Sequence, residues 1–257
     1  MSSAIPFQLR KLSGSFYFWA SAGAAAIVFA GFARTYYLHD LFGRPALPSL
    51  LHIHGAVMSA WFALLALQSC LIATGRRQLH RTLGWVGVGL AVLIVTLGIF
   101  IAVHAAVRDL PKPQLGSIFF LGADAAMVLL FGGLLAAAIA LRRRSDMHKR
   151  LVLLATLSIL PAAIGRLPGL GSIVPVIVAT AIAALLCVAL DTWRQRRLHP
   201  VFGWGAPLVM VALHFAFAAA ESRAWTDFAT RLLSPAGPRT ASTGTTHYAA
   251  RPASRQE

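Results

Sequence analysis

Four histidines and one aspartate lie inside long apolar runs of this sequence. His54, His104 and His214 fall in three different runs, and Asp124 falls in a fourth. Ionisable groups inside membrane spans usually face the bundle interior or a water-filled cavity. Imidazole is a good ligand for zinc, copper and iron, haem iron included. These residues therefore predict a pocket that holds a transition metal or haem b, with Asp124 as a further ligand or on the wall and His52 as an alternative to His54.

The spacing of His52 and His54 restricts how the two can act together. On a helix they point about 200° apart, so only one of them can face a given ion. His54 shares its helical face with Trp61 and Gln68. We expect this face to point inward, because the amide of Gln68 needs a partner. An extended His-x-His segment would instead place both rings on one side, and the spacing alone leaves both arrangements open.

A proton relay is the second interpretation of the same residues. Asp124 would be protonated or paired in hydrocarbon, and Arg166 is the expected ion-pair partner. His214 and Glu221, two turns apart on one face, would extend the relay of a small proton-coupled transporter. Pro161 interrupts the apolar run of residues 151–165 that precedes Arg166, and interrupted helices are found at transport sites. The third interpretation is a non-catalytic membrane scaffold, in which the histidines only cap helices and satisfy one another.

The apolar runs that carry these residues are long enough to cross a bilayer. The chain has 257 residues, of which 58% are hydrophobic and 12% charged, and its mean hydropathy is +0.70. Soluble domains carry about 25% charged residues, and a span needs about 20 apolar residues. We expect an all-α, polytopic membrane bundle of seven transmembrane helices, one helix followed by three hairpins. The expected spans are residues 14–33, 48–74, 82–107, 115–141, 151–165, 172–190 and 203–220.

The rest of the chain divides simply. Residues 1–13 form the expected cytoplasmic leader, residues 14–225 the membrane domain, and residues 232–257 a disordered external tail, because the last segment is rich in Ser, Thr, Pro and Arg. The net charge of +15 would suggest a nucleic-acid partner for a soluble protein. Here the basic residues sit in short loops, where they determine topology, so we expect the lipid bilayer and no nucleic acid as partner.

Three basic turns, each with a histidine, fall on one side of the expected bundle. Counted with the N-terminal segment, that side holds 13 Lys and Arg residues, whereas the opposite loops hold five. The positive-inside rule then places the N-terminus in the cytoplasm and the C-terminus outside. The turns are topology determinants or, alternatively, sites for anionic lipid headgroups or a cofactor's carboxylates. With this topology the polar groups lie toward the outer side, and the inner half is almost purely apolar. The residues of these turns are Arg76, Arg77, His80, Arg81, His148, Lys149, Arg150 and His199.

Several short motifs resemble those of a family of uncharacterised bacterial multi-pass membrane proteins. They are His52-x-His54-Gly55, Leu79-His80-Arg81 and Met147-His148-Lys149-Arg150-Leu151, together with Asp124 and Arg166. The resemblance covers roughly residues 30–170. It implies a bacterial inner (cytoplasmic) membrane protein, and it implies no activity, substrate or cofactor.

The topology is testable with reporter fusions. Fusions after Arg76 and Arg144 should report a cytoplasmic position, and fusions after Arg108 an external one, because the arginine clusters resist translocation. Paired alkaline phosphatase and fluorescent-protein fusions at each site measure this directly. The inverted pattern would contradict the orientation.

Overall fold

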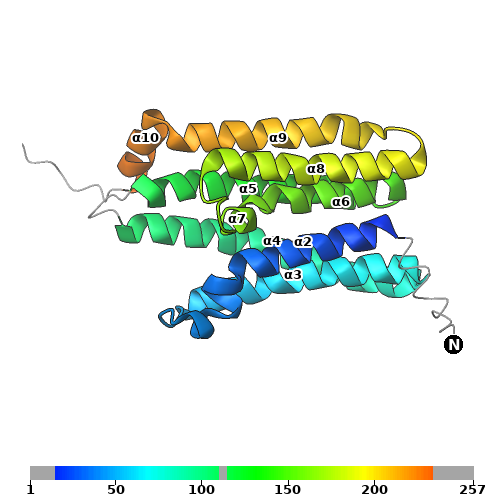
Figure 1. The fold of residues 1–257 in the computed structure, drawn as a ribbon, viewed down its shortest axis with the longest axis horizontal. Coiled ribbons are helices and arrows are strands. Elements are labelled where there is room, and N and C mark those ends of the chain that lie inside the picture. The colour runs from blue at the N-terminus through cyan, green and yellow to red at the C-terminus, as the bar shows by residue number, and fades with distance from the viewer. Residues whose placement is uncertain (1–14, 110–114, 234–257) are drawn as a thin grey trace, which may run out of the picture.

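The computed structural model describes residues 15–109 and 115–233, and every regular element in this part of the chain is a helix (Figure 1). Seven of the described helices are long and apolar enough to cross a membrane. This confirms the predicted all-α bundle of seven spans. The predicted leader and nearly all of the predicted tail lie outside the described residues. The helices are α2 (Phe16–Phe32), α3 (Ser49–Ala73), α4 (Arg77–Asp109), α5 (Leu115–Ala140), α6 (Ser145–Ile159), α7 (Pro161–Ile164), α8 (Ile173–Gln195), α9 (Pro200–Glu221) and α10 (Arg223–Leu233).

The long helices run side by side and alternate in direction (Figure 1). The α3–α4, α5–α6 and α8–α9 turns lie at the end of the bundle where α2 begins, and we call this the basic end, after Arg76, Arg143 and Arg197 in these turns. The opposite end, called the far end, holds α7, α10 and a 3₁₀ turn, His39–Phe42. The alternation follows from short connections between successive spans, which force neighbouring helices to run antiparallel.

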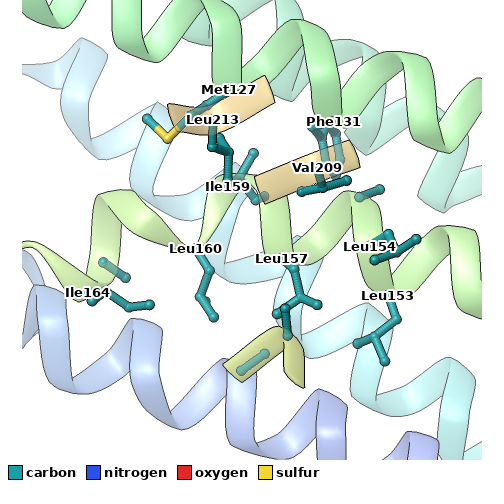
Figure 2. Packing of buried hydrophobic residues seen from close by; sticks show 14 of the residues in the cluster. Met127, Phe131, Leu153, Leu154, Leu157, Ile159, Leu160, Ile164, Val209 and Leu213 are labelled. Carbon is teal, nitrogen blue, oxygen red and sulfur yellow. The ribbon is translucent and has the colours of Figure 1, made fainter. Parts of the chain in front are cut away.

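Helix α6 is the centre of the bundle. It packs against α5, α9, α2 and α8, and in Figure 2 Leu157 and Leu160 point toward α2, whereas Ile159 points toward Leu213 of α9. A helix that is buried all round must be surrounded by other helices. The hydroxyl groups on its buried face donate to its own backbone, as Ser158 does to the Ala155 carbonyl at 2.7 Å. The unbroken buried run continues past the end of α6 and comprises Leu153, Leu154, Ala155, Thr156, Leu157, Ser158, Ile159, Leu160 and Pro161.

Large apolar side chains cover the outside of the bundle. Four tryptophans on four different helices are more than half exposed, and all four lie within a few turns of the basic end. Exposed tryptophans at one level are typical of a membrane–water interface, where the ring sits at the headgroups. The exposed surface therefore fits a bilayer rather than bulk water. These residues are Trp19, Trp85, Trp193 and Trp204.

The helices at the basic end are longer than the sequence predicted. Helix α4 begins at Arg77 instead of residue 82, α6 begins at Ser145 instead of residue 151, and α8 continues to Gln195 instead of ending at residue 190. The predicted boundaries were set where hydropathy falls. Arg, Lys and Gln are good helix formers, so the backbone stays helical beyond the apolar run.

Helix α10 was not predicted. Its first turn is capped by Ser222, whose hydroxyl accepts from the Trp225 backbone N–H at 3.1 Å. The Trp225 indole N–H donates to the Ile118 carbonyl of α5 at 2.9 Å, and Gly122 leaves room for the ring. A serine followed by an amphipathic run is a recognisable helix start, but the segment is too polar to appear in a search for membrane spans.

The central helix is interrupted as predicted at Pro161. Proline has no N–H and its ring obstructs the preceding turn, so α6 ends at Ile159 and the separate turn α7 follows. At this break α2 approaches the backbone closely. A Cβ atom placed on Gly31 would collide with the Ala163 carbonyl group.

The close approach at Gly31 should make a single methyl group destabilising. We expect Gly31→Ala to lower the free energy of unfolding by about 1–3 kcal/mol, the usual cost of overpacking. Gly23→Ala on the same helix is the matched control, since nothing lies within 4 Å of the added Cβ atom, and alanine is the better helix former. Thermal unfolding in detergent measures both variants. Equal stabilities would show that the α2–α7 contact is not tight.

Candidate functional site

Arg166, which follows α7, is the centre of the polar group at the far end. Its guanidinium lies over the Phe32 ring, 4.5 Å from the centroid, and donates to the Ala162 carbonyl. Arg166 also interacts electrostatically with Asp124 of α5 and with His54 of α3. Arg166 is exposed at the edge of the bundle, yet desolvation by neighbouring protein atoms lowers its pKa, and the charge of Asp124 opposes that shift. Three ionisable groups from separate parts of the chain thus share one electrostatic environment.

The predicted ion pair between Asp124 and Arg166 is not among the direct ion pairs formed by the described residues. Their interaction acts at longer range, and the direct pair stays a prediction. Asp124 is half-buried on α5, two residues from Gly122, where α10 packs. Residues two apart on a helix point about 200° apart, so the carboxylate does not share the face of α5 on which α10 packs.

His52 and His54 both lie within α3, so the helical arrangement holds and the extended one does not. The two side chains leave the helix on different sides. His52 is exposed, and its ring lies 6.2 Å from that of His39. His39 in turn pairs with Asp40 at 3.0 Å. His54 is half-buried, and its Nδ1 atom is inaccessible and has no partner within the protein.

The other two predicted ligands point outward. His104 is exposed on α4 and stacks on Phe100 with 6.1 Å between the ring centroids. His214 is also exposed, and it lines a groove of about 740 Å³ together with Glu221 and Ser172, between the start of α8 and the end of α9. His214 and Glu221 thus share one surface, as their spacing predicts.

No group of three His, Cys, Asp or Glu side chains that could hold a metal ion occurs among the described residues. His54 faces into the bundle, whereas His104 and His214 are exposed on other helices. The predicted metal or haem site of His54, His104, His214 and Asp124 therefore has no support in this geometry. It stays a prediction that rests on the residue types.

A buried charge network lies at the basic end, and sequence reasoning missed it. The side chain of Arg150 on α6 is completely buried. Its Nε and Nη2 atoms lie 2.8 Å and 2.7 Å from Oδ2 of Asp191, which α8 carries. The other carboxylate oxygen accepts from the Tyr17 hydroxyl at 2.9 Å and from the Gln195 amide at 2.6 Å. The charges are thus paired, and Nε and Nη1 of Arg150 donate hydrogen bonds to Asp191 and to the Asp146 backbone carbonyl, as a buried charge requires.

The prediction that the inner half of the bundle is almost purely apolar is therefore wrong. It failed because the expected spans leave Asp191 beyond the end of one helix and Arg150 in a turn. In the structure α8 and α6 are longer and carry these two residues into the protein. One signal was available. Asp191 is among only eight acidic residues in the chain, and it directly follows an apolar run. An isolated acid in that position needs a basic partner.

The remaining residues of the predicted basic turns take three different positions. Arg76, Arg77 and Arg81 are exposed around the α3–α4 turn. His80 lies inside α4 and His148 inside α6, where Nδ1 of His148 is 2.9 Å from the Ala138 carbonyl oxygen.

His199 is the N-cap of α9, and its Nδ1 atom accepts from the Val201 backbone N–H at 3.2 Å. Desolvation lowers the pKa of His199, and the nearby charge of Arg150 adds to the shift. The ring therefore stays neutral at pH 7, which an accepting nitrogen requires. This histidine is a structural cap.

The fold and the polar groups together define a class, a seven-helix multi-pass membrane bundle with ionisable groups at both ends. Comparison with known proteins adds nothing to this. No protein-family model, no curated protein and no solved structure matches the chain.

The network around Asp191 should dominate stability at the basic end. We expect Asp191→Asn to lower the free energy of unfolding by about 3–5 kcal/mol, because the Arg150 charge loses its buried partner. Tyr17→Phe removes one hydrogen bond and should cost about 0.5–1.5 kcal/mol. Asp146→Asn is the control, since this exposed carboxylate pairs with Lys149 at 3.0 Å and reaches Arg150 only at 3.9 Å, and it should cost below about 1 kcal/mol. Chemical unfolding in detergent gives the order, and a loss at Asp191 no larger than at Asp146 would contradict it.

Proposed function

We propose that the protein is a small proton-coupled transporter, in which Asp124 carries the proton and Arg166 and His54 tune its release. The sharing of Arg166 carries this proposal, because one guanidinium interacts with both the carboxylate and the imidazole. Ionisable groups in membrane spans are costly and commonly mark proton relays. A proton bound to Asp124 would weaken its attraction for Arg166 and leave the arginine to act on His54 alone.

The interruption between α6 and α7 supports the proposal. Broken helices occur at transport sites, because the ends of half-helices and the freed backbone groups can contact a passing solute. Here the break lies just before Arg166 and is packed against α2 through Gly31. A shift of α7 would therefore move the arginine relative to Asp124.

Two further features fit a transporter better than a redox protein. Charged groups are present at the basic end, where Arg150 and Asp191 are buried. A proton path through the bundle would therefore meet polar groups at this end too. The groove that contains His214 and Glu221 has a volume of about 740 Å³, within the range of about 300–1,000 Å³ typical of small-molecule sites. We assign this groove to solute binding at the far end.

The proposed location is the bacterial inner membrane, with the N-terminus in the cytoplasm. The arginine-rich turns at one end support this orientation. A pocket of about 450 Å³ at the α3–α4 turn is lined by Arg76, Arg77 and Gln78, among others. We propose that it takes an anionic lipid headgroup, which basic clusters at the cytoplasmic face attract.

Proton movement in proteoliposomes tests the function. Vesicles loaded with a pH-sensitive dye are exposed to an imposed pH gradient and to pulses of amino acids, sugars, organic acids and cations. We expect wild-type protein to move protons, and Asp124→Asn to slow this by about tenfold or more, as loss of a proton-transfer group does. Asp146→Asn, which removes an exposed carboxylate, should retain the wild-type rate.

Two results would contradict the proposal. One is a wild-type rate equal to that of protein-free vesicles, and the other is an Asp124→Asn rate equal to wild type. An optical spectrum and metal analysis of the same purified protein belong to the experiment. A haem Soret band or a stoichiometric metal would favour the alternative redox or metal-handling function.

A further inference from the structure

Three buried polar atoms on α3 have no hydrogen-bond partner within the protein. They are Nδ1 of His54, Nε1 of Trp61 and Oε1 of Gln68. The three residues are spaced by seven, so they follow one face of the helix from the far end toward the basic end. Native proteins satisfy nearly all of their buried polar atoms, with protein groups or with ordered water. A row of three on one face therefore indicates a common partner.

This face points into the bundle and not into the lipid. Trp61 is only 5% exposed, and its ring meets Phe131 of α5 edge-on, with 5.0 Å between the centroids. Neither lipid nor bulk water reaches the three polar atoms, so their partner must be held inside the protein. Because α3 supplies both a donor, the Trp61 N–H, and an acceptor, the Gln68 carbonyl oxygen, the partner must be able to accept and to donate.

Polar groups extend the row at both ends. At the far end, His54 interacts electrostatically with Arg166, which also acts on Asp124. Near the basic end, His80 of α4 lies beside the backbone carbonyl of Gln68 and interacts with His148 of α6. Nδ1 of His80 is likewise buried and without a partner in the protein.

We propose that this face of α3 binds a file of ordered water molecules that joins the Asp124–Arg166 group to the His80–His148 group. Each step of seven residues is about 10 Å along the helix, which about three waters can bridge at hydrogen-bond distance. Water both donates and accepts, and buried waters make two to four hydrogen bonds with groups of this kind. The inference rests on the proposed function only where it assigns proton passage to the file. The binding of water stands on the α3 atoms alone.

Hydroxyl-radical footprinting of the full-length protein in nanodiscs tests the file. Radiolysis of bound water oxidises the side chains next to it, including those that bulk solvent does not reach. We expect Trp61 to be oxidised strongly at short exposure, after correction for intrinsic reactivity. Phe62 is the control on the same helix, because it is equally buried, 3% exposed, and carries no polar atom. Labelling of Trp61 as low as that of Phe62 would overturn the proposal.

A nearly isosteric substitution gives a second, independent readout. If Gln68 binds water, Gln68→Met removes a bonded acceptor and should lower Tm by about 2–4 °C. If the site is dry, the same change removes an unsatisfied polar atom and Tm should rise. Leu67→Met, on the exposed side of α3, is the control and should leave Tm unchanged. An unchanged or higher Tm for Gln68→Met would overturn the proposal.

The two proposals fail separately. Strong Trp61 labelling without proton movement in vesicles would leave the water file intact and remove the transport function. Proton movement that depends on Asp124, with a dry α3 face, would do the reverse and place the path elsewhere in the bundle.

Discussion

The packing of the bundle depends on one buried guanidinium. Arg150 lies on α6, which other helices surround, so its charge has no access to water. Asp191 neutralises it at 2.7 Å, and Asp146 lies 3.9 Å from its Nη1 atom. Tyr17 and Gln195 hold the Asp191 carboxylate in place. Helices α2, α6 and α8 must therefore adopt one register at the basic end. An unpaired buried charge costs several kcal/mol, so we infer that this pair sets the register.

The same central helix is constrained differently at the far end. Pro161 ends α6, and the close approach of Gly31 to Ala163 fixes α2 against the short turn that follows. The charge pair fixes one end and a steric contact the other, with a buried run from Leu153 to Ile159 between them. The two hydroxyl groups in this run, on Thr156 and Ser158, donate to the backbone of α6 itself. Polar continuity between the ends cannot follow α6 itself, and the inward face of α3 is where polar atoms recur along the bundle.

Hydropathy predicted the number of spans, and the proline predicted the break at Pro161. Both features depend on residue types alone. Hydropathy did not predict which way a helix faces. His54, His104 and His214 fall at comparable depth in the sequence, yet only His54 turns inward, because rotation about the helix axis depends on packing partners far away in the chain. Arg150 and Asp191 were missed for a related reason, since apolar length marks the hydrocarbon layer and not the end of the backbone helix.

The direction in which each histidine faces bears on the chemistries that the residue types allow, and it favours the transport proposal. A metal needs several ligands that converge on one point, whereas a proton path needs polar groups one after another with water between them. His104 and His214 face outward, so they can serve neither as converging metal ligands nor as steps of a proton path inside the bundle. His214 can still contact a solute in the groove that it lines. His54 is inward, shares Arg166 with Asp124 and begins a row of polar atoms that continues to His80. That arrangement is linear and not convergent, and linear order is what proton movement across a bundle requires.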